Sequence, residues 1–199
     1  MTTTLDSALV EEGAPATATG AVEASILRIR AGELEAFEDL MVLIEGKVLA
    51  VAWRLLGDRE PARDAAQETF LRIYRSLDRF RLGEDFHGWC YRITVNVCLD
   101  HLKARGPVSP ELPEVPDPHQ ADPEEAVLLD QRRALVRQAL GSLTPAERAA
   151  LVLRDLEGLD TEAVARALGV RAVTVRSQVS SARAKVQRFC SRFLKGGVR

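Results

Sequence analysis

The sequence predicts an all-α protein of two small helical domains joined by a Pro-rich acidic linker, the C-terminal domain being a helix-turn-helix. Only 5% of its 199 residues are aromatic, and the good helix formers Ala, Leu, Arg and Glu dominate. Clusters of β-branched residues bounded by turn signals are scarce, whereas helix-start patterns occur in both halves of the chain. In chain order we expect a disordered tail (1–24), a helical domain (25–105), a linker (106–123) and a second helical domain (124–195).

The N-terminal tail is expected to be disordered because it is rich in small residues and lacks hydrophobic periodicity. It contains no Lys or Arg and four acidic residues, so it does not fit a signal peptide, which needs basic residues followed by an apolar block. No stretch of the chain reaches the length of an apolar membrane span. Three cysteines form no disulfide framework. We therefore expect a cytoplasmic protein without membrane insertion.

Two helices are predicted in the first domain. Glu60-Pro61 marks the start of one that runs through Leu77. The other begins near Phe86 and is apolar around most of its circumference. At 100° per residue its polar side chains share one narrow sector, a stripe made of Trp89, Arg92, Asn96, Asp100 and Lys103.

This stripe is of a kind that suits DNA, since bases stack on aromatic rings while amide and guanidinium groups pair with base edges. The preceding loop, residues 81–85, is short and able to cradle an extruded base. The alternative is a solvated helix face with Trp89 in the core.

A metal site is not expected, although one face of the same helix carries His87, Cys90, Cys98 and His101. Zinc needs all its ligands within about 2.3 Å of one point. The two histidines are separated by roughly 21 Å along an unbroken helix at 1.5 Å per residue. Packed cysteines are the favoured interpretation, and no cofactor is predicted.

The second domain contains a capping box, Thr144-Pro145-Ala146-Glu147, with proline at the first helical position. Residues 161–185 are typical of two helices joined by a tight turn: one helix at 161–168, capped by Asp160 or Thr161, then Gly169, then a helix from about 173 to 189. In a helix-turn-helix the second helix enters the major groove. An ordinary helical hairpin is the alternative.

Charge is segregated along the chain, although the net charge is only −2. Residues 106–130 carry seven acidic and no basic residues, whereas residues 131–199 carry 14 basic and five acidic residues. A compact basic segment suits a polyanionic partner. It therefore favours DNA binding by the helix-turn-helix.

Three motifs, in order, resemble the sigma-70 family of RNA polymerase sigma factors, extracytoplasmic-function subfamily. They are DAAQETFLR at 64–72, FHGWCYRITVNVCLDHLK at 86–103, and the stretch from Leu143-Thr144-Pro145 through Leu156-Glu157-Gly158-Leu159 and Gly169-Val170 to Thr174-Val175-Arg176-Ser177. The resemblance covers about residues 25–105 and 124–190. It implies an alternative transcription initiation factor that binds core RNA polymerase, reads −10 and −35 promoter elements and promotes melting.

The resemblance also implies which residues act. Docking on core polymerase would use Asp64, Gln67, Glu68, Phe70 and Arg72. The −10 element, with one base flipped from the non-template strand, would be read by Phe86, Trp89, Arg92, Asn96 and Lys103. The −35 duplex would be read by Arg171, Thr174, Arg176, Ser177, Ser180, Ser181, Arg183 and Lys185. An anti-sigma factor is a further expected partner, and the linker would thread toward the polymerase active-centre channel.

Two residues depart from the family pattern, and two other function classes have to be considered. Related sequences often carry a basic or aromatic residue where this chain has Ser180 and Ser181, so its base preference at −35 is open. A stand-alone helix-turn-helix regulator would explain the second domain but not the motifs at 64–72 and 86–103. An enzyme is not expected, because the chain has three histidines, no phosphate-cradling glycine loop and no nucleophile–base pair.

Overall fold

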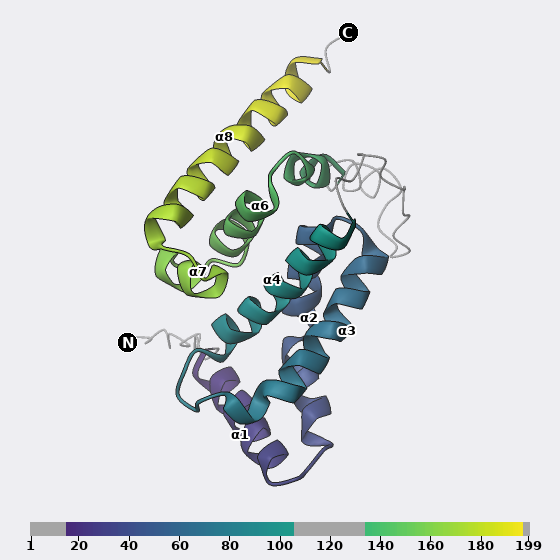
Figure 1. Ribbon diagram of the computed structural model, residues 1–199, viewed down its shortest axis with the longest axis vertical. Helices are drawn as coiled ribbons and strands as arrows, with labels where there is room; N and C mark the ends of the chain where they lie inside the picture. The colour runs from purple at the N-terminus through teal and green to yellow at the C-terminus, as the bar shows by residue number, and fades with distance from the viewer. Residues whose placement is uncertain (1–14, 106–133, 197–199) are drawn as a thin grey trace, which may run out of the picture. The chain divides into compact units, whose positions relative to one another are not determined.

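The computed structural model describes residues 15–105 and 134–196, and every regular element in these two ranges is a helix (Figure 1). The predicted all-α fold class is therefore confirmed. Residues 1–14, the predicted linker and residues 124–133 lie outside the described part. Among the described helices, none combines the length and the apolar character needed to cross a membrane.

The chain divides into two compact units, one ending at Ile44 and the other starting at Glu45. The helices are α1 (Pro15–Arg30), α2 (Ala36–Leu56), α3 (Arg59–Ser76), η1 (Leu77–Arg79), α4 (Phe86–Arg105), α6 (Pro145–Leu151), η2 (Val152–Leu156), α7 (Thr161–Leu168) and α8 (Ala172–Gly196). Residues 134–141 are also helical. Within the second unit we call residues 45–105 the α3–α4 block and residues 134–196 the α6–α8 block.

Helix α1, at Pro15–Arg30, corrects the expectation that residues 1–24 form a disordered tail. The helix starts at Pro15, a residue favoured at the first helical position because it lacks an N–H that would go unpaired there. Val22 and Ile26, one helical turn apart, are buried. These two positions were overlooked because small and polar residues surround them. Arg28 then pairs with Glu33 at 2.8 Å and with Asp39 at 2.8 Å across the turn to α2.

The predicted helix from Glu60 through Leu77 is confirmed as α3 followed by η1. Asp58 caps α3 by accepting a hydrogen bond from the Glu60 amide at 3.3 Å. Small buried residues, among them Ala62, Ala65 and Ala66, allow α3 to approach α4 closely. Helix α4 begins at Phe86 as predicted, and the Asp85 carboxylate accepts from the Gly88 amide at 2.9 Å. A Cβ at position 88 would overlap that carboxylate in its present position, so any other residue there would make the Asp85 side chain shift.

The α6–α8 block contains the predicted helix-turn-helix (Figure 1). The capping box is present in full, since Thr144 Oγ1 accepts from the Glu147 amide and Glu147 accepts from the Thr144 amide. Helix α7 has the predicted bounds and is capped by Asp160. Gly169 follows it with φ 65°, in the left-handed region. Helix α8 continues beyond the predicted end near residue 189 to Gly196.

Two glycine substitutions should have opposite effects on stability. Gly169→Ala places a Cβ on a residue with φ 65° and should lower the free energy of unfolding by about 1 kcal/mol. Gly46→Ala adds a Cβ in the interior of α2, where nothing lies within 4 Å, and should raise it by about 0.5–1 kcal/mol. Urea unfolding followed by circular dichroism measures both, and equal effects of the two substitutions would contradict the assigned turn.

Candidate nucleic-acid interfaces

The polar stripe on α4 lies on the surface. Arg92, Asn96 and Lys103 are exposed, and Trp89 is half-buried. Within the described ranges, Arg92 and Asn96 have no side-chain hydrogen bond or ion pair to another residue, whereas Lys103 Nζ lies 3.8 Å from Asp100 Oδ1. The two unpaired groups can therefore meet a ligand without first breaking an internal contact.

An aromatic cluster holds Trp89 at the start of the stripe. The ring centroid of Trp89 lies 5.3 Å from that of Phe80 and 5.6 Å from that of Phe86, and the two phenylalanine rings meet edge to face at 5.2 Å. Phe86 is buried, so it supports the indole from below instead of facing solvent. The adjacent loop 81–85 is exposed and turns at Gly83, with φ 85°. A rigid ring beside an exposed loop is a suitable platform for stacking an unpaired base.

The histidines and cysteines of α4 have separate environments. Cys90 and Cys98 are buried, and burial raises the pKa of both thiols, that of Cys98 to about 12. These two thiols are therefore protonated and poor nucleophiles at neutral pH. His101, on the same helix, contacts an acidic side chain of α3: its Nε2 lies 2.9 Å from Glu68 Oε2. No group of three or more His, Cys, Asp or Glu side chains within the described residues is arranged to hold a metal ion.

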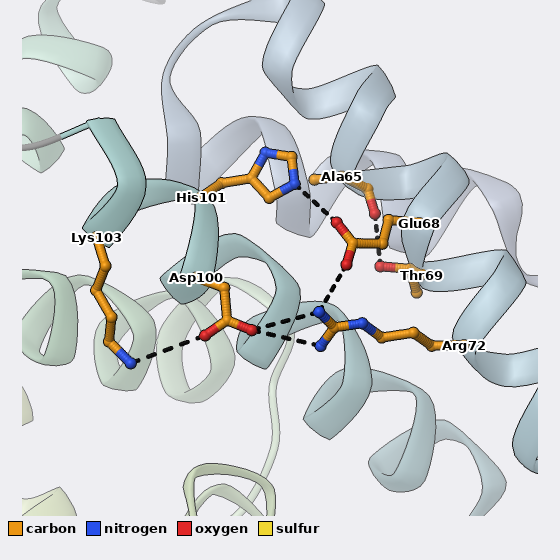
Figure 2. Close-up of polar contacts among 7 residues, drawn as sticks. All are labelled: Ala65, Glu68, Thr69, Arg72, Asp100, His101 and Lys103. Atoms are coloured by element: carbon orange, nitrogen blue, oxygen red, sulfur yellow. Dashed lines mark hydrogen bonds and ion pairs between the residues drawn. The ribbon is translucent and has the colours of Figure 1, made fainter.

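Two of the predicted polymerase-docking residues, Glu68 and Arg72, form a polar network between α3 and α4 (Figure 2). Arg72 Nη2 donates to Glu68 Oε1 at 2.6 Å, and both terminal nitrogens lie 3.4 Å from Asp100 Oδ2. Hydrogen bonds from His101 and Arg72 lower the pKa of the Glu68 carboxyl. Through Asp100 this network reaches the polar stripe, so α3 and the stripe are mechanically connected.

The remaining docking candidates share the outer face of α3. Asp64 and Gln67 are exposed, and Phe70 is half-buried. Leu71 and Tyr74 are exposed at 54% and 44% on the same face, and sequence reasoning did not select either as a site residue. Their helical spacing with Gln67 gives one mixed apolar and polar surface. Exposed apolar groups ringed by polar ones mark protein-binding surfaces.

The candidate −35 residues fall into two groups along α8. Arg171, Arg176, Ser177 and Ser180 are exposed toward its N-terminal end, and Thr174 is half-buried. Arg176 Nη2 lies 3.7 Å from Glu162 Oε1, an exposed and therefore weak pair. Val173, 57% exposed, was not predicted as a contact. A groove of about 520 Å³ beside this face is lined in part by Arg154, Arg176 and Arg183, and Arg154 was also missed.

The second group is paired with two carboxylates of the same domain. Ser181 Oγ donates to Glu147 Oε1 at 2.6 Å, and Lys185 Nζ donates to both Glu147 oxygens at 2.7 and 2.8 Å. Arg183 makes a two-point contact with Asp155 at 2.6 and 2.8 Å. Lys185, Ser181 and the Thr144 amide lower the pKa of Glu147 to about 2. These three predicted DNA contacts therefore have partners on α6 and η2, elements that precede the helix-turn-helix.

Comparisons with known proteins agree with the motifs. Residues 43–107 match the family model described as Sigma-70 region 2, and residues 133–186 match Sigma-70, region 4. The chain is 34% identical over 179 residues to the RNA polymerase sigma-H factor of Pseudomonas aeruginosa, a match that covers 84% of this chain and 93% of that protein. It is 37% identical over 163 residues to the ECF RNA polymerase sigma factor SigE of Mycolicibacterium smegmatis, covering 80% of this chain and 63% of that protein.

One similar solved structure is the sigma factor RpoE in complex with the anti-sigma factor NepR from Bartonella quintana. It has 21% sequence identity and a TM-score of 0.65, and the match covers 79% of this chain and 98% of that chain. At this identity the likeness supports the fold.

Replacing Glu147 should weaken the α6–α8 block and its response to acid. Because the folded pKa of about 2 lies below the ordinary value of 4.5, this carboxylate stabilises the fold above pH 4.5, and its contribution is lost as pH falls toward 2. Glu147→Gln should lower the free energy of unfolding at pH 7 by about 2 kcal/mol. It should also flatten the dependence of stability on pH below 4.5.

Denaturant unfolding between pH 2.5 and 7 measures both effects. The matched control is Glu162→Gln, which removes the same charge from an exposed position of α7 and should change stability by less than about 0.5 kcal/mol. Similar losses in the two variants would contradict the role assigned to Glu147.

Proposed function

The chain belongs to the extracytoplasmic-function group of the sigma-70 family, and from this premise we propose that it binds core RNA polymerase and directs it to promoters with −10 and −35 elements. The observation that carries the proposal is the presence of both family regions, in order, on one chain. Each region also has an exposed polar face on a helix that a second helix supports. Working on chromosomal DNA, the protein would act in the cytoplasm.

Helix α4 reads the −10 element in this proposal and assists melting. Arg92 and Asn96 pair with exposed base edges, and Lys103 meets phosphate. A base flipped from the non-template strand stacks on Trp89, whose ring is braced by Phe80 and Phe86. Capturing an unstacked base lowers the free energy of the open duplex by an amount of the order of 1–3 kcal/mol per stacked base, so opening needs no nucleotide hydrolysis.

Helix α8 reads the −35 duplex with its N-terminal half. Arg176 suits a guanine edge, and the serine hydroxyls of Ser177 and Ser180 suit contacts with several different bases. The exposed Val173 suits contact with a thymine methyl group. Arg171 and Arg154 meet phosphates in this proposal. Ser181, Arg183 and Lys185 act mainly as supports in this scheme, because their partners Glu147 and Asp155 hold the helix from behind.

The outer face of α3 docks on core polymerase. Leu71 and Tyr74 supply apolar area, and Asp64 and Gln67 supply polar specificity, while Glu68 and Arg72 tie the docked helix to α4. In this proposal, docking of α3 fixes the orientation of α4, the −10 reader. An anti-sigma factor is a further proposed partner, in line with the complex formed by the Bartonella sigma factor. A stand-alone DNA-binding regulator is the competing function.

Run-off transcription tests the proposal. Core RNA polymerase is incubated with fragmented genomic DNA from the source organism, with and without the protein. We expect transcripts that depend on the protein and fall at least tenfold with Arg92→Ala or Trp89→Ala. Lys47→Ala, which removes an exposed positive charge from α2, is the control and should transcribe normally. Specific DNA binding without polymerase, together with no new transcripts, would favour the stand-alone regulator.

Docking on polymerase is tested separately by binding to fluorescently labelled core enzyme without DNA. Leu71→Ala and Gln67→Ala should each weaken binding about fivefold or more, because buried apolar anchors dominate protein interfaces. Arg166→Ala, an exposed substitution on α7, should leave the affinity unchanged. Equal affinities for all four proteins would mean that another surface contacts the polymerase.

A further inference from the structure

Two arginines of α8 have similar exposure but very different partners. The side chains of Arg176 and Arg183 are exposed at 66% and 60%. Arg176 lies 3.7 Å from Glu162 through one nitrogen. Arg183 instead donates from Nε and Nη2 to the two oxygens of Asp155, at 2.8 and 2.6 Å. The positive charge of Arg183 is therefore largely neutralised where it stands, whereas that of Arg176 remains available to a ligand.

Both arginines line the groove of about 520 Å³ beside α8, and Asp155 does not line it. Asp155 follows Arg154 in η2, and its side chain is 26% exposed. The hydrogen bonds from Arg183, together with the charges of Arg183 and Arg154, lower the pKa of the Asp155 carboxyl. This carboxylate is therefore ionised at neutral pH and places a full negative charge behind Arg183.

The pair limits what Arg183 can offer to DNA. Attraction to phosphates is independent of sequence and grows with the number of cations that displace counterions. The Nε–Nη2 edge, on which a guanidinium can hold a phosphate by two hydrogen bonds, is occupied by Asp155. If Arg183 moved to a phosphate, Asp155 would be left unpaired beside a polyanion. The exchange therefore gains little free energy, and Arg183 stays with Asp155.

A second basic residue of α8 is neutralised in a similar way, but there the carboxylate has another role. Lys185 is 33% exposed and is paired with Glu147, which also caps α6. Removing Glu147 would thus weaken the fold as well as free a charge. In the part of the chain that the structure describes, the Asp155 side chain accepts hydrogen bonds from Arg183 alone. Asp155 is therefore the acid whose effect on DNA affinity can be measured separately from folding.

We propose that Asp155, by holding Arg183, restrains the sequence-independent affinity of α8 for DNA, so that bulk DNA does not capture the free protein before it meets polymerase. This inference rests on the function proposed above, in which α8 binds duplex DNA. Non-specific sites on a chromosome far outnumber promoters, and each further cation that neutralises a phosphate favours all of them alike. The pair withdraws one such cation and leaves Arg176, Ser177 and Ser180 exposed for base reading.

A double-mutant cycle on the full-length protein tests this role. Binding to a labelled duplex of random sequence is measured at several salt concentrations, and circular dichroism checks the fold. Asp155→Asn should tighten binding at least threefold at low salt and steepen the slope of log K against log salt by about 0.9, the value for one added phosphate contact. In an Arg183→Gln background the same change should steepen the slope by less than half as much. Glu45→Gln, an equal change of charge at an exposed position of α2, is the control and should match the wild type.

Capture by bulk DNA is measured in run-off transcription. Each protein is first mixed with excess random duplex, and core polymerase and genomic fragments are added afterwards. Asp155→Asn should lose at least threefold more activity to the competitor than the wild type or Glu45→Gln.

Four results would each overturn the proposal. They are equal duplex affinities of the wild type and Asp155→Asn, an equal gain from Asp155→Asn with and without Arg183, the same gain from Glu45→Gln, and an unchanged loss of activity to the competitor. Arg176→Ala separates this inference from the proposed function. If that variant binds the duplex as well as the wild type, DNA binding by α8 fails; if it binds more weakly and Asp155→Asn gives no gain, only the role of Asp155 fails.

Discussion

The single carboxylate of Glu147 caps the start of α6 and also binds the middle of α8. Its oxygens accept from the Thr144 amide at the start of α6 and from Ser181 and Lys185 in the middle of α8. A carboxylate that is only 11% exposed is tolerated there because both of its oxygens accept hydrogen bonds from protein donors. These contacts tie α8 to α6, and the Asp155–Arg183 pair ties α8 to the neighbouring η2 turn. The exposed residues of α8 are presented by this support.

In the α3–α4 block, different contacts hold the helix that carries the exposed polar residues. Small side chains bring α3 close to α4, and Arg72 and Glu68 then join the two helices through Asp100 and His101. These groups are partly exposed, so each pair contributes little to stability by itself. Their value lies in geometry, because they link a surface suited to protein docking with a surface suited to DNA. In both blocks, charged side chains orient a helix whose packing is supplied by apolar residues.

The helices were predictable wherever local signals agree. The capping box at Thr144, the left-handed glycine at 169 and the apolar spacing of α3 and α4 act within a few residues, so the sequence alone reveals them. Helix α1 was missed because Val22 and Ile26 are too few to stand out among small residues. The two roles of basic side chains on α8 could not be separated either: Arg176 and Arg183 look alike in sequence, and only the position of Asp155 distinguishes them. Leu71 and Val173 were missed because exposure is a property of the folded surface.

The two tryptophans of the chain lie in different surroundings. The Arg137 guanidinium lies 5.8 Å from the centre of the Trp53 ring, whereas Trp89 lies in the aromatic cluster at the start of the polar stripe. Indole emission responds to a nearby cation and to a stacked base, and the two rings sense these separately. Single-tryptophan versions of the protein would therefore carry a built-in optical probe at each site. Their signals would report, without any attached dye, on the surroundings of each ring.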